Sequence, residues 1–186
     1  MKDVRHKAIM IPRAGDKFLT VRDSRHQEWI FITGGCKKSE MNDPLRCGLR
    51  ELEEETRGVF SIKEGTYTTY EFESSYRSPE ELRNDRAEGL TVSLVYHVFI
   101  IDVNLTLERQ SEIVKTFYNI KHRMDSNKIN GVRIKRAYDE NDCISFDTLE
   151  EFNRKKRWRL IVNNVIDNPK FYTALSPTAE KIPFTW

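Results

Sequence analysis

The segment from Asp43 to Gly58 carries a full set of helix signals in this chain of 186 residues. Asp43 is suited to the N-cap, Pro44 to the first helical position, and Gly58 to the position just past the helix end. We therefore predict a helix over residues 43–57. A helix with one apolar stripe has to bury that stripe, so the fold must supply a partner layer.

Strand-like runs lie on both sides of this helix. They are KAIMIP, KFLTVRD and EWIFITGG before it, and TYTTYEF and LTVSLVYHVFIIDV after it, with a polar loop between the last two. A second helix is predicted over residues 105–124, followed by the turn SNKING, the strand CISF, and a last helical region that Asp147 caps. This order predicts an α/β fold, a mixed β-sheet sandwiched between helices, within one domain of residues 1–186.

The composition limits the class of protein. The 31 basic and 29 acidic residues give a net charge of only +2. Cys36, Cys47 and Cys143 form neither a CxxC pair nor a disulfide framework, which indicates free thiols in a reducing compartment. No apolar run reaches the roughly 18 residues of a membrane span, and the amino terminus lacks a signal-peptide layout. We therefore expect a cytoplasmic protein without membrane contact.

The predicted helix has an acidic face. Glu51, Glu54 and Glu55 stand at i, i+3 and i+4, so their carboxylates project to one side, away from a separate stripe of leucines. One interpretation is a solvated surface, and the other is a socket for Mg²⁺ or Mn²⁺, which prefer oxygen ligands. Two glycines before the helix, which let the backbone approach a ligand, and Arg50 beside Glu51 favour the second interpretation.

These residues resemble the Nudix box, whose pattern is G-x5-E-x7-R-E-U-x-E-E-x-G-U, with U an aliphatic residue. RELEEE at residues 50–55 matches the core of the pattern without a gap, and the whole segment covers about residues 34–59. The chain departs from the pattern at two places. Four residues separate Gly35 from Glu40 and nine separate Glu40 from the arginine, and Gly58 falls one place late.

The resemblance implies the Nudix fold and a metal-dependent hydrolase, with Mg²⁺ or Mn²⁺ as cofactor, that cleaves a diphosphate linked to a nucleoside. It implies that Glu54 and Glu55 are the principal metal ligands and that Glu51 binds or positions a metal or its water. The Gly35 carbonyl is implied as a further ligand, and Arg50 as the residue that orients the carboxylates. Metal ions suit this chemistry because they neutralise the diphosphate charge and lower the pKa of a bound water.

A further acidic ligand in this family often comes from a late loop. The segment YDENDCISFDTLEEF resembles that region, with Glu140 as the candidate and Asp139 and Asp142 as rivals; an ordinary polar turn is the alternative. The predicted substrate-binding residues lie within the box and after it: Lys37, Lys38, Glu40 and Tyr76. The lysines are candidates for phosphate contact or solvated turn residues, and Tyr76 lies near a position associated with dinucleoside-polyphosphate members.

Two basic segments bear on the substrate. Residues 106–136 hold eight Lys/Arg against three Asp/Glu, within a probable insertion over residues 105–136, and RKKRWR occupies residues 154–159. Interleaved aromatic residues such as Trp158 could stack on bases while the basic residues track phosphates, so RNA contact is one interpretation. The other is a set of solvated helix faces with buried aromatic residues.

Three hypotheses about function remain. The first is an mRNA-decapping hydrolase that releases methylated GDP. The box and the basic insertion look similar to the Nudix decapping enzymes of large DNA viruses. A viral enzyme of this kind would act in the host cytoplasm. The second is a small-molecule pyrophosphatase acting on dinucleoside polyphosphates, nucleotide sugars or free nucleotides. The third is a binding module without catalysis, which the intact glutamates disfavour. The sequence leaves the oligomeric state open.

Overall fold

The computed structural model describes all residues, 1–186. The strands are β1 (Lys2–Ala14), β2 (Lys17–Asp23), β3 (Trp29–Ile30), β4 (Ile32–Gly35), β5 (Glu64–Ser74), β6 (Thr91–Asp102), β7 (Asn141–Asp147) and β8 (Ile182–Thr185). The α-helices are α1 (Pro44–Glu55), α2 (Pro79–Ala87), α3 (Leu107–Ile129), α4 (Leu149–Asn153), α5 (Arg159–Ile161) and α6 (Pro169–Leu175). Short 3₁₀ turns cover Lys38–Glu40 and Arg136–Tyr138, and a π-helical turn covers Val162–Ile166.

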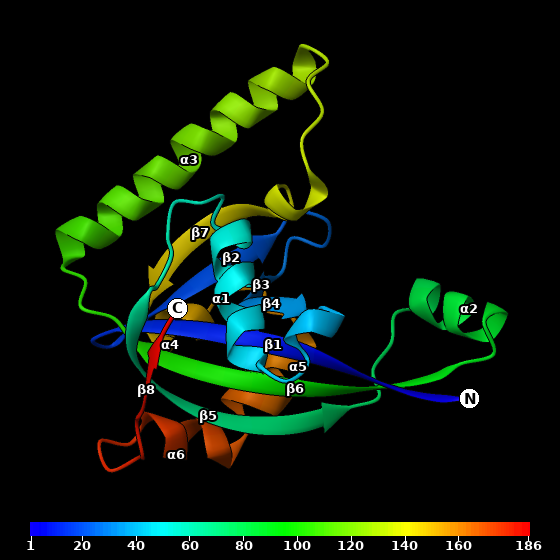
Figure 1. The fold of residues 1–186 in the computed structure, drawn as a ribbon. Helices are drawn as coiled ribbons and strands as arrows, with labels where there is room; N and C mark the ends of the chain where they lie inside the picture. Colours follow the sequence, from blue (N-terminus) through cyan, green and yellow to red (C-terminus); the bar gives the residue numbers. More distant parts are fainter.

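All eight strands belong to one mixed sheet with helices on both faces (Figure 1). Along β1, alternate side chains enter two different cores because successive residues of a strand point to opposite faces. Ala8 and Met10 pack with α1 and α3, whereas Ile9 and Ile11 pack with α4, α5 and α6. The predicted α/β sandwich is therefore confirmed.

The sheet opens into a V beside α1. β1 and β2 pair only near their hairpin, from Arg13 opposite Phe18 to Ala14 opposite Lys17. Beyond that point β3 pairs with β2 and β4 pairs with β1, both antiparallel. β3 and β4 follow each other along the chain with only Phe31 between them, so the chain passes at Phe31 from the β2 arm of the V to the β1 arm. β7 lies along the other edge of β2, so β4 and β7 end on the two arms of the V.

The predicted helix at the centre of the chain is confirmed as α1. The Asp43 carboxylate accepts a hydrogen bond from the Arg46 main-chain N–H at 3.3 Å, which makes it the N-cap. Gly48 brings α1 close to β1, because a Cβ at this position would lie 2.6 Å from Cε of Met10. A glycine inside a helix lowers its intrinsic stability, so close packing on the sheet explains this position.

Other predictions need correction. The polar loop before β6 contains α2, and the helix predicted to end at residue 124 continues to Ile129. Asp147 ends β7, and Thr148 caps α4 instead. The short strand β8, which pairs with β5, was not predicted.

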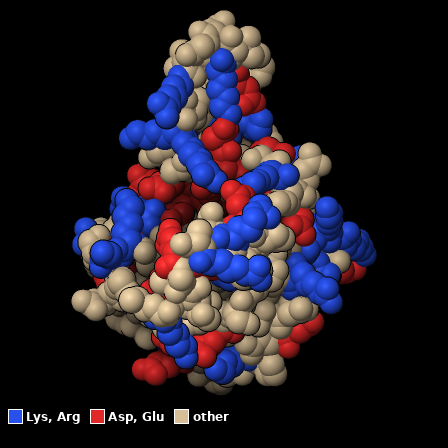
Figure 2. All heavy atoms as spheres, turned by 90° about the vertical axis from the view of Figure 1, so that its right-hand side faces the viewer, with Lys and Arg blue, Asp and Glu red and all other residues tan.

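The segment predicted as an insertion, residues 105–136, forms a projection. α3 starts over the sheet, and its carboxyl-terminal end extends beyond it before the chain returns to β7 (Figure 1). Figure 2 shows acidic side chains recessed among Lys and Arg side chains below the tip of this projection. None of the helices combines the length and apolar character needed to cross a lipid bilayer.

Candidate active site

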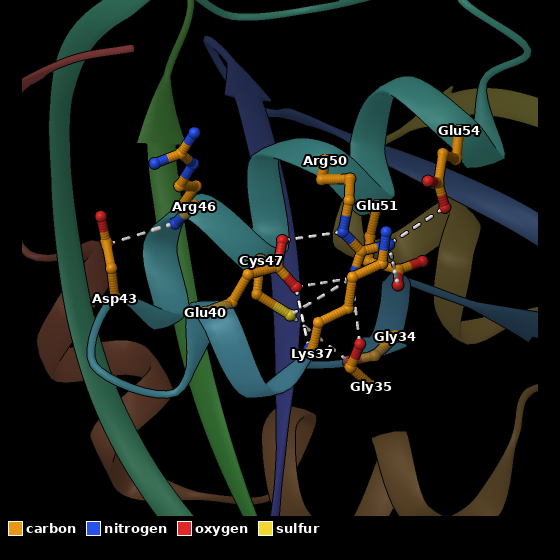
Figure 3. Close-up of polar contacts among 10 residues, drawn as sticks. All are labelled: Gly34, Gly35, Lys37, Glu40, Asp43, Arg46, Cys47, Arg50, Glu51 and Glu54. Atoms are coloured by element: carbon orange, nitrogen blue, oxygen red, sulfur yellow. Dashed lines mark hydrogen bonds and ion pairs between the residues drawn. The ribbon is translucent and has the colours of Figure 1, made fainter.

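The acidic face of α1 points toward the end of β4, and Arg50 lies at the centre of it (Figure 3). Its Nε and Nη2 donate to the two carboxylate oxygens of Glu40, at 2.8 and 2.9 Å. Its Nη1 donates to Glu51 at 2.9 Å and Glu54 at 3.1 Å, and Nη2 donates to the Gly35 carbonyl at 3.0 Å. Each of the five guanidinium N–H groups therefore has an acceptor, which fixes the orientation of all three carboxylates.

The pairing of Arg50 with Glu40 is a two-point ion pair. Hydrogen bonding to Glu40 raises the pKa of Arg50, and hydrogen bonding from Arg50 lowers the pKa of Glu40. Glu40 also accepts a hydrogen bond from the Lys37 main-chain N–H at 2.9 Å, and it is only 6% exposed. The carboxylate of Glu40 is thus engaged within the chain, where it supports Arg50.

Glu51 lies in a space that Gly34 leaves open. A Cβ on Gly34 would lie 1.9 Å from Cδ of Glu51, so no other residue fits at position 34 while Glu51 keeps this place. Burial raises the pKa of Glu51 to about 7. Gly34, the first of the two glycines before the helix, therefore leaves the space that the Glu51 side chain occupies.

Glu55 crosses the open V of the sheet. Its carboxylate accepts a hydrogen bond from Nδ2 of Asn141, at the start of β7, at 3.2 Å, and the main-chain N–H of Thr33 on β4 acts on the same carboxylate to lower its pKa. It is 4% exposed. Burial, followed by the charges of Glu51 and Glu140, raises the pKa of Glu55 well above its usual range. The two arms of the V therefore meet at one buried carboxyl group.

The donor set suits a hard divalent cation. Glu51, Glu54 and Glu55 are held on one face at the end of α1, and their mutual repulsion is the kind that a cation relieves. No group of three or more His, Cys, Asp or Glu side chains converges in the geometry of a metal site. Instead, Nη1 of Arg50 lies between Glu51 and Glu54. Carboxylate oxygens match Mg²⁺ and Mn²⁺ better than softer metals.

The three acids of the late loop have different surroundings. Asp142 forms a two-point ion pair with Arg22, and Asp139 pairs with Lys128 and, at 3.6 Å, with Arg57. Glu140 has no such partner. Burial raises the pKa of Glu140, and the charge of Glu54 contributes to this shift. Among these acids, only Glu140 is therefore available to act with the glutamates of α1.

The remaining predicted substrate residues lie at two places. Lys37 and Lys38 are exposed on the loop that follows Gly35. Tyr76 lies between β5 and α2, where it is 53% exposed and contacts Trp158 edge-on with ring centroids 6.4 Å apart. The structure thus brings the lysines to the glutamate cluster and places Tyr76 in a separate aromatic contact.

Sequence reasoning missed Asn141, Thr33 and the contacts of Arg57. Asn141 and Thr33 reach Glu55 only because the fold brings β4, β7 and α1 together. Arg57 has a positive φ of 58°, and its side chain, 2% exposed, lies over the ring of Phe117. The late position of Gly58 was the one sequence signal that pointed to this site.

With this geometry established, comparison with known proteins assigns the family. The family model described as NUDIX domain matches residues 4–124, so the chain belongs to the NUDIX domain family. Because residues 50–55 keep the arginine and the glutamates, the chain is a Nudix hydrolase that acts on nucleoside-diphosphate-linked substrates.

Several solved structures are similar to the chain. A NUDIX hydrolase from Nitrosomonas europaea is 13% identical, with a TM-score of 0.49, over 87% of this chain and 85% of that one. The dihydroneopterin triphosphate pyrophosphohydrolase of E. coli is 14% identical, with a TM-score of 0.47, over 88% and 96%. A C. elegans Ap4A hydrolase is 12% identical, with a TM-score of 0.43, over 87% and 90%. No curated protein sequence matches the chain. Similarities this low carry no argument about substrate.

Proposed function

We propose that the chain uses Mg²⁺ or Mn²⁺ to hydrolyse a phosphoanhydride bond in capped RNA, acting as an mRNA-decapping enzyme that releases methylated GDP. The observation that carries the hydrolase part is the arrangement of Glu51, Glu54 and Glu55 around Arg50 and Gly35. In this proposal Glu54 and Glu55 are the principal metal ligands, with Glu51, Glu140 and the Gly35 carbonyl as further donors.

Each residue of the site has a defined task in this proposal. The metal supplies charge neutralisation and a bound water of lowered pKa. Arg50 holds Glu51 and Glu54 in place, Gly34 leaves room for Glu51, and Asn141 fixes Glu55. Such fixed groups contribute to catalysis because they need no reorganisation during the reaction.

The attachment of α3 to the site supports an RNA substrate. Lys128, near the end of α3, pairs with Asp139, which precedes Glu140 directly and pairs with Arg57. A chain of nucleotides leaving the glutamates on this side would meet the return loop, whose Arg133 and Lys135 are exposed and have no ion-pair partner in the chain. In contrast, Lys155 of the second basic segment pairs with Asp147 and contacts the ring of Trp29, so we assign RNA contact to residues 106–136 first.

A small-molecule pyrophosphatase is the second candidate. A cavity of about 410 Å³ that reaches Gly35 favours it, because this volume lies within the range of small-ligand pockets. Such an enzyme would act on dinucleoside polyphosphates or free nucleotides and would not depend on RNA length.

The decisive experiment is a substrate panel of capped RNA, free cap analogue, dinucleoside polyphosphates and ADP-ribose, each assayed with Mg²⁺ and with Mn²⁺. The decapping proposal expects methylated GDP from capped RNA, and a rate that increases with RNA length and decreases with salt. Fast turnover of free dinucleotides with indifference to RNA length would replace it with the second candidate.

A pair of variants tests the RNA path. Arg133→Gln/Lys135→Gln removes two charges of the return loop, and Lys17→Gln/Lys170→Gln removes two charges elsewhere. The first variant is expected to weaken capped-RNA turnover and to lower its salt dependence, while free cap analogue is cleaved at the wild-type rate. Equal behaviour of the two variants on RNA of every length would contradict RNA contact at this loop.

A further inference from the structure

A cavity of about 410 Å³ adjoins the glutamate cluster at Gly35. Its walls come from the first half of β1, from the loop after β4, and from the segment that leads into α2. We call it the Lys7 groove and define it by Arg5, Lys7, Gly35, Lys38, Arg77 and Glu81. Because it shares Gly35 with the glutamate cluster, a ligand held by the glutamates can continue into it.

The fixed charges of the groove are already paired. Arg5 pairs with Asp3 at 2.9 Å, and both lie in the groove wall. Arg77 forms a two-point ion pair with Asp85 and also contacts Glu81 at 2.7 Å. These pairs use up the acids of the groove and hold the wall beside α2 in place.

Two lysines of the groove remain without partners. The amines of Lys7 and Lys38 make no hydrogen bond or ion pair with any other residue of the chain, although both line the same cavity. Lys38 is exposed, whereas Lys7 is half-buried. The net charge that the groove offers to a ligand is therefore positive, and Lys7 is the less exposed of its two unpaired lysines.

Lys7 lies between the glutamate cluster and the groove wall beside α2. On β1 it lies directly opposite Gly35 in the β-ladder. The charges of Glu51 and Glu140 act on it from the glutamate cluster, and those of Glu81 and Arg77 act on it from the wall beside α2. Burial lowers the pKa of Lys7. A partly desolvated ammonium without a partner is costly, and an anionic ligand offsets this cost.

We propose that the Lys7 groove binds the substrate phosphates that extend beyond a diphosphate held at the glutamate cluster. The enzyme then prefers substrates in which three or more phosphates bridge two groups over those with only two phosphates. This inference rests on the proposed function, and it specifies a substrate class that a cap triphosphate and a dinucleoside polyphosphate share. A cationic or apolar ligand does not suit the groove, because the unpaired charged groups of the groove are the ammonium groups of Lys7 and Lys38.

The first test compares kcat/KM for a substrate with three bridging phosphates and for one with two. Free cap analogue and diadenosine triphosphate represent the first class, and ADP-ribose represents the second. Lys7→Gln is expected to lower the ratio of the two kcat/KM values by about tenfold or more, mainly through KM for the longer bridge, as for a lost charge-assisted hydrogen bond. Lys7→Arg should keep most of the preference, and Lys17→Gln, a lysine on β2 outside the groove, should keep all of it.

The second test measures binding without catalysis or metal. Inorganic tripolyphosphate and pyrophosphate are titrated into the full chain in EDTA by calorimetry, after thermal unfolding has shown that each variant folds. Tripolyphosphate is expected to bind the wild type more tightly than pyrophosphate does, and Lys7→Gln should remove the difference. Equal affinities of the wild type for the two anions, or an unchanged difference in Lys7→Gln, would overturn the proposal that the Lys7 groove binds the additional phosphates. Absence of hydrolysis on every substrate would overturn the proposed function instead, while the binding result still decides on the groove.

Discussion

Arg57 donates a hydrogen bond of 2.9 Å to the main-chain carbonyl of Asn141, whose side chain in turn holds Glu55. Arg57 has a left-handed backbone conformation with φ of 58°, at the place where the Nudix pattern has glycine. Its guanidinium carbon also lies 5.4 Å from the ring centroid of Phe117 on α3. One side chain therefore connects the end of α1 to α3 and to the start of β7.

Substitutions of Arg57 should separate backbone strain from side-chain contacts. Arg57→Ala loses the contacts and keeps an unfavourable φ, whereas Arg57→Gly loses the same contacts and adopts this φ freely. We expect Arg57→Ala to be less stable than Arg57→Gly by about 1 kcal/mol in urea unfolding. Both variants should lose about tenfold or more in kcat, since Asn141 no longer fixes Glu55. Wild-type kcat in both would show that Arg57 is not a positioning residue.

Neighbouring glutamates of α1 should differ sharply in their effect on activity. Glu54 contacts Arg50 at 3.1 Å, while Glu53 faces away and has only a 4.0 Å contact with the exposed Lys63. We expect Glu54→Gln to lower kcat by about two orders of magnitude or more in the presence of Mg²⁺ or Mn²⁺. Glu53→Gln makes the same chemical change one residue earlier and should stay within about twofold. Similar losses in the two variants would contradict the assigned metal roles.

The two glycines at the end of β4 provide another matched pair. A Cβ on Gly34 would meet the carboxylate of Glu51, whereas a Cβ on Gly35 would have no neighbour within 4 Å. Gly34→Ala is expected to displace Glu51 and to lower the free energy of unfolding by about 1–3 kcal/mol. It should also lose more activity than Gly35→Ala, because Glu51 is a proposed metal-site residue. Gly35→Ala keeps its carbonyl and should retain both properties. Steady-state kinetics and urea unfolding of both variants check this difference, and an inactive, stable Gly35→Ala would point to a steric role for position 35.

A histidine pair with one buried member, His97, should make stability depend on pH. His97 on β6 lies 2.9 Å from Nδ1 of His6 on β1 and 3.1 Å from the carboxylate of Glu71 on β5. Burial lowers the pKa of His97 below the usual 6.5, despite the opposing effect of Glu71. As the pH falls through 6.5, the unfolded chain takes up this proton before the folded chain does. The contribution of neutral His97 to the free energy of unfolding is therefore complete above pH 6.5 and decreases below it.

Urea unfolding at pH 7.5 and pH 5.5 measures this contribution. The wild type should lose more stability between the two pH values than His97→Gln, which cannot take up the proton. An equal loss in both proteins would show that His97 does not contribute to the acid side of the stability curve.

The local part of the site was predictable from the sequence. The glutamates of α1 share a face because of their i, i+3 and i+4 spacing, and the N-cap Asp43 and Pro44 mark the start of the helix. α2 carries a comparable signal, since Ser78 and Glu81 cap each other across its first turn. It was missed because this helix has no apolar stripe.

The long-range part of the site was not predictable. Glu55 and Asn141 are 86 positions apart, and neither residue type indicates the pairing. The contact of Arg50 with Glu40 spans the loop whose length departs from the Nudix pattern. The place of Glu40 in that pattern therefore did not predict which residue its carboxylate contacts. β8 is short and contains Pro183, and it exists only because β5 offers a free edge. Each of these features depends on tertiary packing rather than on local preference.

The V in the sheet has a consequence for how this enzyme can change over time. Its two arms belong to separate hydrogen-bond ladders, so the usual strand spacing does not set the width of the cleft between β4 and β7. That width depends on the connection at Phe31 and on the single carboxyl group of Glu55. Small changes in the loops at either end can therefore reshape the cleft without breaking a strand pair, and substrate range can evolve while the scaffold stays intact.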